Sequence, residues 1–516
     1  MITTRLFLII ALLFSPKIPL LGQEEPIIRG KVVDLKSGNS IPFATIRLIT
    51  QKGIHGVISN AEGDFQIPTT YKTIVDTIRI SCIGYLNKKL LINDLTDDRI
   101  NVIRLEESVR QLSEVIIKGK KEGRVTAEKI VQAAIENIPI NYPVTANSYV
   151  GYYRDYQLGA DQYINLNEAI VEVFDEGFSS NDQLTTALDL LDYKKNEEFK
   201  RDSTTDIAYD NAHGNKFIPG AILSPFGGNE LSILRMHDAI RNSQTFSYSY
   251  INELDTDFIK NHRFKFAETV YLNKIPLYNI TFHSKPEITG SKHFAKGHLY
   301  IERGNFAIHT LEYTTYENEN SKTKMLYNIR VEYSRLNSLM HLNFISFNNL
   351  FKIRDPLDFK VEDILFDRDA NAFVVTFNKI PEQQSALDWK NYDFSLDNEK
   401  LKIEKVEGFN ERGKEKVVVV YLQRYLPFIK ITELVNRMKV DVKGVKDMTG
   451  REVNVVTHIS VNQFRELFVQ AQTDHSKLVS DSLHILKDTP LSENKIRISS
   501  DTNTSNYWMN TPLKKE

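Results

Sequence analysis

The pattern His309-Thr310-Leu311-Glu312 is the first place in this sequence where metal chemistry could be sought. Zinc enzymes hold their ion with histidines and a carboxylate. Residues 307–316 alternate as a β-strand does, and residues three apart on a strand point to opposite faces. His309 and Glu312 could therefore share an ion only if the strand were broken. We interpret them as a surface histidine and a cross-strand acid, and we expect neither a metal nor a cofactor.

Three further histidines, His283, His293 and His298, surround an expected hairpin that contains Gly290 and Lys292. Imidazoles are common metal ligands, so these side chains could hold an ion if the hairpin folded them together. Histidines in solvated loops are the simpler interpretation, and it is the one we favour.

Two carboxylates, Glu168 and Glu172, are in phase with apolar residues on an expected strand over 163–174. A pair of carboxylates could serve a glycosidase. Arg154 lies on the preceding expected strand, 149–156, which should pair antiparallel with the first. Arginine offers a carboxylate a two-pronged partner, and a charge on a core-facing position needs one. We therefore predict a structural Arg154–Glu168 bridge and name no catalytic residue.

The chain offers few nucleophiles for covalent catalysis. Cys82 is the only cysteine, so no internal disulfide can form, and its apolar β-type surroundings indicate a buried, inert thiol. The sequence contains no G-x-S-x-G pattern, which is the motif of the α/β-hydrolase nucleophile.

The elements that would position these residues begin with short β-branched runs, separated by turn residues, over 28–105. Four motifs occur in order: Gly30-x-Val32-x-Asp34, Pro42-x-Ala44-Thr45-Ile46, Asn60-x-x-Gly63-Asp64-Phe65, and Ile80-Ser81-Cys82-Ile83-Gly84-Tyr85. This order resembles the carboxypeptidase-regulatory-like domain. The resemblance implies a prealbumin-like, seven-stranded sandwich of the kind found at the start of exported and outer-membrane proteins of Bacteroidetes-type bacteria. The family is named for its place beside zinc carboxypeptidases, so the resemblance does not imply peptidase activity.

Length and composition indicate an exported chain of several domains. The 516 residues exceed a single core, and 28 Phe and 23 Tyr against 2 Trp suit β-sheets. A formal net charge of -2 gives no basis for nucleic-acid binding. Arg5 followed by the apolar residues 6–14 predicts a signal peptide over 1–23, with the mature chain beginning near Gln23 or Glu24. We expect membrane association rather than a membrane-spanning helix.

The middle of the chain predicts an α+β region. Helices are expected over 126–137, 182–195 and 231–241, and strands over 263–272, 277–284, 296–303, 307–316, 324–334 and 339–347. The piece 297–308 resembles the curved half-barrel of periplasmic lipoprotein-carrier proteins. Residues 127–351 as a whole resemble the uncharacterised region that often follows this sandwich in Bacteroidetes envelope proteins.

The last third of the chain predicts a second sandwich and a tail. Expected strands cover 373–377, 417–421 and 438–442, and residues 444–450 resemble the closing turn of bacterial immunoglobulin-like domains. The polar tail ends in Tyr507 and Trp508, aromatic residues that are able to dock back onto the body of the protein.

We therefore expect a mainly β protein with an N-terminal prealbumin-like sandwich, an α+β middle with an antiparallel meander or half-barrel, and an Ig-like sandwich. The expected ranges are a signal peptide over 1–23, the first sandwich over 24–118, a linker over 119–124, the α+β region over 125–355, the Ig-like sandwich over 360–465 and a polar tail over 466–516.

The predicted function is binding or scaffolding without catalysis, in the periplasm, outer membrane or cell surface, toward a glycan, a peptide or an outer-membrane protein. Two alternatives stay open. One is a component of outer-membrane nutrient uptake, which the family context of the sandwich implies. The other is a peptide or glycan hydrolase that uses carboxylates of the middle region.

Overall fold

The computed structural model describes residues 26–50, 53–108, 125–159, 162–210, 212–219, 229–243, 258–319, 322–408, 415–426, 437–473, 484–497 and 506–514. The expected signal peptide and the expected linker lie outside these ranges. Within them, no helix combines the length and the apolar character needed to cross a bilayer. The chain is mainly β, as its composition and alternating patterns predict.

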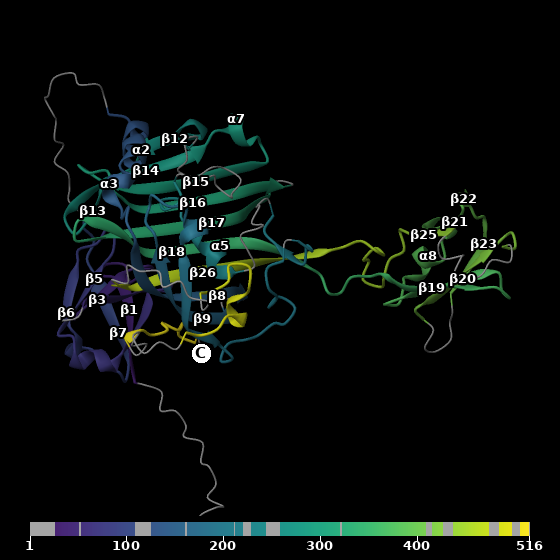
Figure 1. Cartoon of the computed structure of the whole chain (residues 1–516), viewed down its shortest axis with the longest axis horizontal. Helices are drawn as coiled ribbons and strands as arrows, with labels where there is room; N and C mark the ends of the chain where they lie inside the picture. The colour runs from purple at the N-terminus through teal and green to yellow at the C-terminus, as the bar shows by residue number, and fades with distance from the viewer. Residues whose placement is uncertain are drawn as a thin grey trace, which may run out of the picture.

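The described part begins with a two-sheet sandwich, drawn in purple in Figure 1. One sheet has the order β4-β1-β7 and the other the order β3-β2-β5-β6. The strands are β1 (Ile27–Asp34), β2 (Thr45–Thr50), β3 (Gly53–Ile58), β4 (Asp64–Pro68), β5 (Thr77–Ser81), β6 (Lys88–Leu91) and β7 (Ile100–Leu105). Gly63 has φ +78°, and a Cβ there would lie 2.6 Å from the Val32 carbonyl oxygen. The seven-stranded prealbumin-like sandwich is therefore confirmed.

A 12-stranded sheet forms the centre of the described molecule. Its main path is β10-β9-β8-β26-β18-β17-β16-β15-β14-β12, with β11 beside β18 and β13 beside β14. The bounds are β8 (Asn147–Gly159), β9 (Gln162–Asp175), β10 (Ala187–Lys195), β11 (Lys216–Phe217), β12 (His262–Phe266), β13 (Val270–Leu272), β14 (Ile275–Ser284), β15 (His293–Glu302), β16 (Ile308–Glu319), β17 (Lys322–Leu336), β18 (Leu339–Arg354) and β26 (His458–Thr473). The run from β14 to β18 pairs each strand with the next, which confirms the antiparallel meander.

The expected helix over 182–195 is wrong. A single turn, α4 (Asp182–Thr185), is followed by strand β10, which pairs antiparallel with β9. Leu188 and Leu190 are buried on this strand. The backbone of β10 hydrogen-bonds to β9, and no local sequence pattern reveals this partner. Tertiary pairing of this kind overrides local propensity.

The expected helix over 126–137 is confirmed as α2 (Ala127–Glu136), with the Thr126 side chain accepting from the Lys129 amide. The expected helix over 231–241 is shorter, α5 (Glu230–Arg235). The other short turns on this side are α3 (Ile138–Asn141), α6 (Phe258–Asn261) and α7 (Pro286–Thr289). Apolar residues of α2, α3 and α5 pack with one face of the sheet in a single core cluster.

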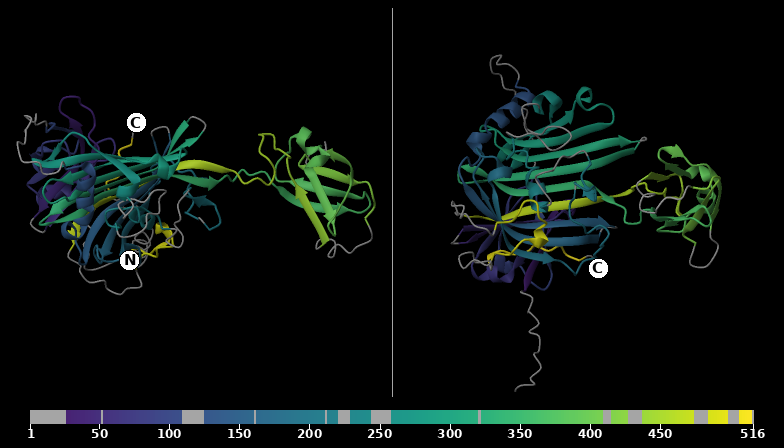
Figure 2. Two further views of the ribbon diagram at one scale, coloured as in Figure 1. Left: turned by 90° about the horizontal axis from the view of Figure 1, so that it is seen from above. Right: turned by 45° about the vertical axis from the view of Figure 1, so that its right-hand side comes forward.

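A smaller sandwich, which we call the arm, is inserted between β18 and β26 and has its own core. Its sheets have the orders β19-β20-β24-β23 and β22-β21-β25. The bounds are β19 (Val361–Asp367), β20 (Ala372–Phe377), α8 (Gln383–Ala386), β21 (Tyr392–Leu396), β22 (Glu399–Lys400), β23 (Ile403–Gly408), β24 (Val417–Leu422) and β25 (Met438–Val442). Figure 2 shows that two neighbouring chain segments join the arm to the rest. Its Ig-like identity stays a prediction.

The expected start of the polar tail at residue 466 is wrong, because residues 466–473 belong to a strand of the central sheet. Strand β26 begins before residue 466 and runs through the middle of the central sheet, where it pairs antiparallel with both β18 and β8. It joins the two halves of the sheet, β8 to β10 and β12 to β18. The second sandwich therefore ends before β26 rather than at residue 465.

The C-terminal segment 506–514 docks onto the first sandwich and the central sheet. Trp508 is only 9% exposed, packs in the sandwich core, and donates from Nε1 to the Gln66 carbonyl at 2.9 Å. The Gln470 side chain on β26 hydrogen-bonds both the Trp508 carbonyl and the Trp508 amide. The segment thereby ties the sandwich to one face of the sheet, while the helices cover the other face.

Candidate functional site

Arg154 forms its ion pair with a different carboxylate from the one we predicted. Strands β8 and β9 do pair antiparallel, and Arg154 lies directly opposite Glu168. However, Arg154 Nε contacts Glu466 Oε2 on β26 at 2.5 Å, and its guanidinium lies over the rings of Tyr156 and Phe468. Strand β8 has a neighbouring strand on each side, β9 and β26. Only β9 is close to β8 in the sequence, so only a partner on β9 could be predicted.

Glu168 is fully buried and is held by neutral donors. It accepts from Tyr152 Oη at 2.6 Å, Asn196 Nδ2 at 2.7 Å and Thr511 Oγ1 at 2.9 Å. Glu172 is four residues further along β9, which separates the two backbones by about 13 Å. A glycosidase pair needs carboxyl groups about 5–10 Å apart, so the strand geometry does not support that role.

His309 and Glu312 have separate partners. His309 is 3% exposed, and its Nε2 lies 2.9 Å from Glu302 Oε2. Glu312 instead contacts Arg330, at 3.1 Å. Each side chain therefore has its own partner. The surface position expected for His309 is wrong, because its side chain lies on the face of the sheet that the first sandwich covers. The expectation of opposite faces is also wrong, because His309 is the extra residue of a bulge in β16, which puts it on the same face as Glu312.

The three other histidines lie on strands, not in solvated loops. His283 is on β14, and His293 and His298 are on β15, five residues apart and therefore on opposite faces. His293 lies 3.5 Å from Glu317 and His298 lies 3.7 Å from Glu312. In the part of the chain that the structure describes, no group of three or more His, Cys, Asp or Glu side chains is arranged to hold a metal ion.

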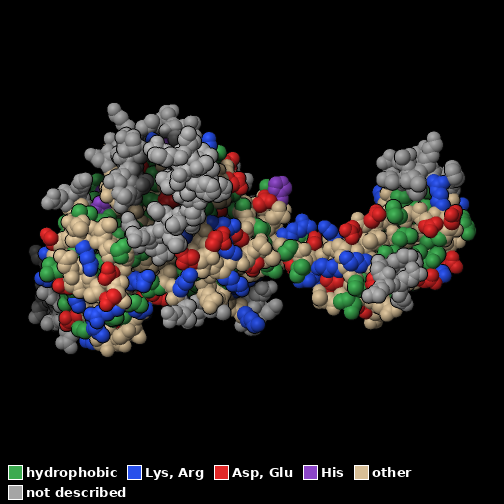
Figure 3. Space-filling view, turned by 90° about the horizontal axis from the view of Figure 1, so that it is seen from below, with side chains coloured by type: hydrophobic (Ala, Val, Ile, Leu, Met, Phe, Trp, Pro, Cys, Tyr) green, Lys and Arg blue, Asp and Glu red, His purple; other side chains and the backbone are tan. Residues whose placement is uncertain are grey.

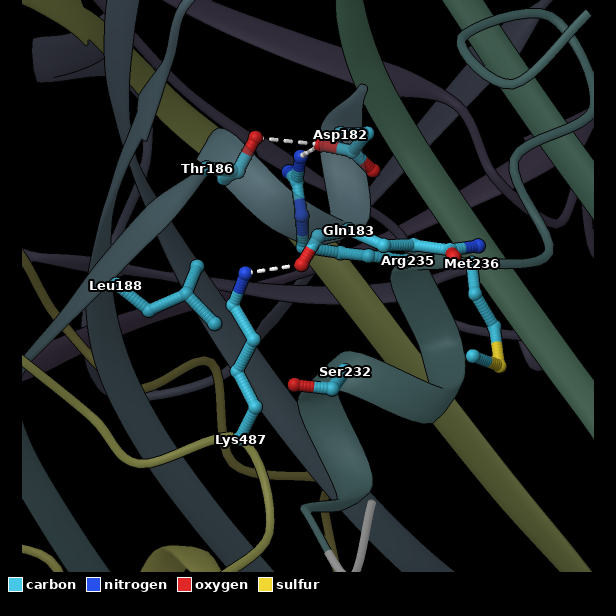
Figure 4. Close-up of a pocket in the computed structure, with 8 residues that line it drawn as sticks. All are labelled: Asp182, Gln183, Thr186, Leu188, Ser232, Arg235, Met236 and Lys487. Atoms are coloured by element: carbon cyan, nitrogen blue, oxygen red, sulfur yellow. Dashed lines mark hydrogen bonds and ion pairs between the residues drawn. The ribbon is translucent and has the colours of Figure 1, made fainter. Parts of the chain in front are cut away.

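One buried pocket beside α4 and α5 is structural. Figure 4 shows Arg235 directed at Asp182, with the Thr186 hydroxyl donating to the same carboxylate at 2.6 Å. Lys487 donates to the Gln183 carbonyl. The cavity measures about 30 Å³, which is room for about one water molecule. Asp182 and Arg235 pair with each other, and Lys487 is bonded to a backbone carbonyl, so we assign the pocket no ligand.

A larger chamber lies between the first sandwich and the central sheet, and we call it the interface chamber. Its volume is about 350 Å³. Strands β2 and β5 form one wall, and strands β15 to β18 form the other. Phe43 stacks on Phe344 with ring centroids 5.0 Å apart, and Asn343 Nδ2 donates to Thr45 Oγ1 at 3.1 Å. These contacts hold the two walls together, so the chamber exists only where the first sandwich packs on the central sheet.

The sandwich wall places two arginines side by side. Arg47 on β2 lies directly opposite Arg79 on β5, so both side chains leave the same face of the sheet. Arg47 Nη2 donates to Ser334 Oγ at 2.7 Å across the chamber. Burial, and then the charge of Arg79, lower the pKa of Arg47. Neither arginine has a carboxylate within 4 Å among the described residues.

The sheet wall carries two more arginines, and these are paired. Arg330 contacts Glu332 at 2.6 Å and Glu312 at 3.1 Å, and Arg335 contacts Glu302 at 3.0 Å. Burial opposes the charge of Arg330, but the two carboxylates outweigh it and raise its pKa. The positive charge left over in the chamber therefore belongs to the sandwich wall.

Several buried polar atoms at the chamber lack a hydrogen-bond partner among the described residues. They are Asn87 Oδ1, His298 Nε2, His309 Nδ1 and Thr310 Oγ1. Burial lowers the pKa of His298, which favours the neutral imidazole. Buried polar groups are usually hydrogen-bonded, so such atoms around one cavity are consistent with a ligand or ordered water.

Cys82 also lines the interface chamber, where it is half-buried. Burial, and then the charge of Glu332, raise the pKa of its thiol to about 12, so the thiol is protonated at neutral pH. The expectation of an unreactive thiol agrees with this environment.

Sequence reasoning missed the arginine pair, although a signal for it was present. Arg47 stands between Ile46 and Leu48, and Arg79 between Ile78 and Ile80, so alternation puts both charges on the outer face of the sandwich. Nothing in the pattern says that this outer face meets a second sheet. Elsewhere acidic and basic side chains are intermingled, as on the face drawn in Figure 3.

Comparisons with solved structures find remote likenesses. One is a LolA superfamily protein from Nitrosomonas europaea, with 12% identity and a TM-score of 0.19, covering 44% of this chain and 86% of that chain. Another is a putative outer membrane lipoprotein-sorting protein domain from Vibrio parahaemolyticus, with 12% identity and a TM-score of 0.23, covering 43% and 86%. TM-scores this low carry no argument on fold or function.

The sequence comparisons concern the first sandwich. No curated protein matches the chain. A protein-family comparison matches residues 28–117, the stretch that carries the four ordered motifs. This part of the chain is similar to the CarboxypepD_reg-like domain.

Proposed function

We propose that the protein is a non-catalytic binding protein of the cell envelope, and that its interface chamber binds a ligand through an anionic group, a carboxylate or a phosphate. The observation that carries this proposal is the Arg47–Arg79 pair, which faces the chamber without a carboxylate of its own among the described residues.

The electrostatics of this pair support an anionic ligand. Like charges directly opposite each other on neighbouring strands destabilise a sheet. Arg47 experiences this repulsion, because Arg79 is the second cause of its lowered pKa. An anion between the two guanidinium groups would relieve the repulsion, and arginine forks match the oxygens of carboxylate and phosphate. The arginines of the opposite wall are occupied by glutamates and would contribute less.

The size and lining of the chamber are also suited to binding. A volume of about 350 Å³ is within the usual range for small-molecule pockets. Phe43 and Tyr300 add aromatic surface, and unpartnered polar atoms such as Thr310 Oγ1 add hydrogen-bonding groups. The one thiol of the chamber, Cys82, is held in its protonated, weakly nucleophilic form, and Ser334 accepts a hydrogen bond from Arg47.

The cellular setting is part of the proposal. The expected signal peptide supports export, and the similarity of residues 28–117 to the CarboxypepD_reg-like domain supports an extracytoplasmic setting by its family context. A role in outer-membrane nutrient uptake would be compatible with the same chamber. The hydrolase alternative loses its main support, because Glu168 and Glu172 are too far apart along β9 to act together.

The proposal can be tested by isothermal titration calorimetry of the mature chain with inorganic phosphate and with citrate. We expect at least one of these anions to bind and Arg47→Gln to weaken its binding by about tenfold or more, since a charge-assisted hydrogen bond contributes about 1.5–3 kcal/mol. Binding of phosphate would indicate a site for a phosphate group, and binding of citrate would indicate a site for a carboxylate.

Arg104→Gln is the matched control, because Arg104 is an exposed arginine on β7 of the same sandwich and does not line the chamber. It should leave the affinity unchanged. Anion binding that is equally weakened by both substitutions would indicate a general surface effect. Absence of binding by either anion, or binding that Arg47→Gln does not change, would contradict the proposal.

A further inference from the structure

A second chamber lies on the other face of the central sheet, and we call it the concave-face chamber. Its volume is about 230 Å³. Asp155 on β8 points into it, whereas its neighbour Arg154 points to the sandwich side, as alternation along a strand requires. Lys216 on β11, Glu230 at the start of α5 and Arg465 on β26 also line it. The remaining charged lining residues are more solvent-accessible: Lys195, Asp206 and Glu493.

The first four of these charged groups form no ion pair. Asp155, Lys216 and Arg465 are 5%, 7% and 1% exposed, and Glu230 is half-buried. No oppositely charged side chain of the described residues lies within 4 Å of any of them, whereas other buried charges such as Arg235 and Arg241 have close carboxylates. A buried charge normally needs a partner, so four charges held apart around one cavity call for a bridging ligand.

The two cations are held together at one side. Lys216 Nζ lies 4.9 Å and the Arg465 guanidinium 4.8 Å from the centre of the same ring, Phe351. Arg465 donates from Nη1 to Asn349 Oδ1 at 2.6 Å, but its Nε has no hydrogen-bond partner among the described residues. Lys216 donates to the Ile207 carbonyl at 2.8 Å. The cation pair therefore retains donors for an anionic group.

The two acids are also close enough to affect each other. Burial, and then the charge of Asp155, raise the pKa of Glu230 to about 7. Asp155 accepts from Asn167 Nδ2 at 2.9 Å, and Glu230 accepts from the Leu491 amide at 3.2 Å. Each carboxyl keeps oxygen lone pairs beyond these bonds, since a carboxylate offers about four acceptor sites.

We propose that the concave-face chamber binds a free α-amino acid, with its carboxylate at Lys216 and Arg465 and its ammonium group at Asp155 and Glu230. Such a ligand supplies both missing partners at once, and its two opposite charges match the two cations and two acids of this set. A volume of about 230 Å³ corresponds to about eight water molecules at ~30 Å³ each, which suits one small molecule and no polymer. This inference stands independently of the interface chamber, which lies on the opposite face.

The test is a thermal-shift screen of the mature chain against the common L-amino acids and glucose, followed by calorimetry with each compound that raises the melting temperature. We expect an amino acid to bind, and its N-acetyl and methyl ester derivatives, which each lack one charge, to bind at least about tenfold more weakly. Glucose tests whether the chamber selects hydroxyl groups instead of charges.

Lys216→Met removes one cation and keeps the length of the side chain. We expect it to weaken amino-acid binding by about tenfold or more and to raise the melting temperature of the ligand-free protein, because a buried unpaired charge is replaced by an apolar group. A loss of binding through misfolding would instead lower the melting temperature. Asp155→Asn, which keeps the hydrogen-bonding shape, should weaken binding through the ammonium group.

Lys195→Met is the matched control, because Lys195 lines the same chamber but is 52% exposed and already paired with Asp206 at 3.1 Å. Its affinity should remain within about twofold of the parent chain, as expected for an exposed pair. The proposal is overturned if no amino acid binds, if the N-acetyl and ester derivatives bind equally well, or if glucose alone binds.

Discussion

The docking of the C-terminal segment 506–514 can be tested at Trp508. Trp508→Ala removes the one side chain of this segment that enters the sandwich core, where it packs against Tyr71 with ring centroids 5.1 Å apart. It also removes the hydrogen bond from Nε1 to the Gln66 carbonyl. The substitution should therefore loosen the segment from the sandwich.

The expected magnitude follows from burial. A large aromatic side chain buries about 150–250 Å², and at about 25 cal/mol per Å² this corresponds to about 3.5–6 kcal/mol for a tryptophan that is 9% exposed. The docked segment can also detach from the sandwich instead of leaving a cavity at position 508. The decrease in the free energy of unfolding of the sandwich therefore cannot exceed the free energy with which the whole segment docks. We expect Trp508→Ala to reduce the stability of the sandwich by about 3–5 kcal/mol, and Trp508→Phe by about 1–2 kcal/mol.

The assay uses the tryptophans of the chain themselves. The sequence holds 2 Trp, and the second, Trp389 in the arm, is 56% exposed. In a Trp389→Phe background, the emission reports on Trp508 alone and should be that of a buried indole. Guanidinium titration of this variant follows undocking, and circular dichroism of the Trp508→Ala protein follows the sandwich.

Trp389→Ala is the control and should change the stability of the sandwich by less than about 0.5 kcal/mol, as is usual for exposed positions. The reasoning fails if Trp508 already emits like a solvent-exposed indole in the native protein. It fails equally if Trp508→Ala and Trp389→Ala have the same small effect on unfolding.

Three further predictions concern charge, pH and autonomy. In a double-mutant cycle measured by denaturant unfolding, Arg154 and Glu466 should be coupled, and removing Glu466 alone should cost about 3–5 kcal/mol because the arginine is stranded; additive effects would exclude the pair. Burial lowers the pKa of His237 from 6.5 to about 4, so the neutral form is favoured in the fold, and the stability that it contributes above pH 6.5 should be lost as the pH falls toward 4; His237→Phe should reduce this slope in unfolding measured against pH. The fragment 24–118 should melt cooperatively as a β-protein, and a peptide of residues 506–514 should raise its melting temperature; a disordered fragment would show that the sandwich depends on its neighbours.

The alternation of apolar and polar residues was sufficient to predict the strands of the meander and the β character of the first sandwich. Side chains on a strand change face at every residue, so a repeat of two fixes both the element and the side that is buried. The same alternation placed Arg47 and Arg79 on one outer face. Ordered turn motifs such as the one that contains Gly63 identified the sandwich type.

The tertiary structure decided what those faces meet. Glu466 lies 312 residues after Arg154, and no local pattern shows that β26 enters the sheet beside β8. The same insertion brings Arg465 to the concave-face chamber, and the docking of the sandwich on the sheet creates the interface chamber. Strand pairing depends on backbone partners that can come from any distance along the chain. Local alternation therefore determined many strands and their faces, whereas only the fold determined that β10 and β26 are strands of the central sheet and which charged side chains pair.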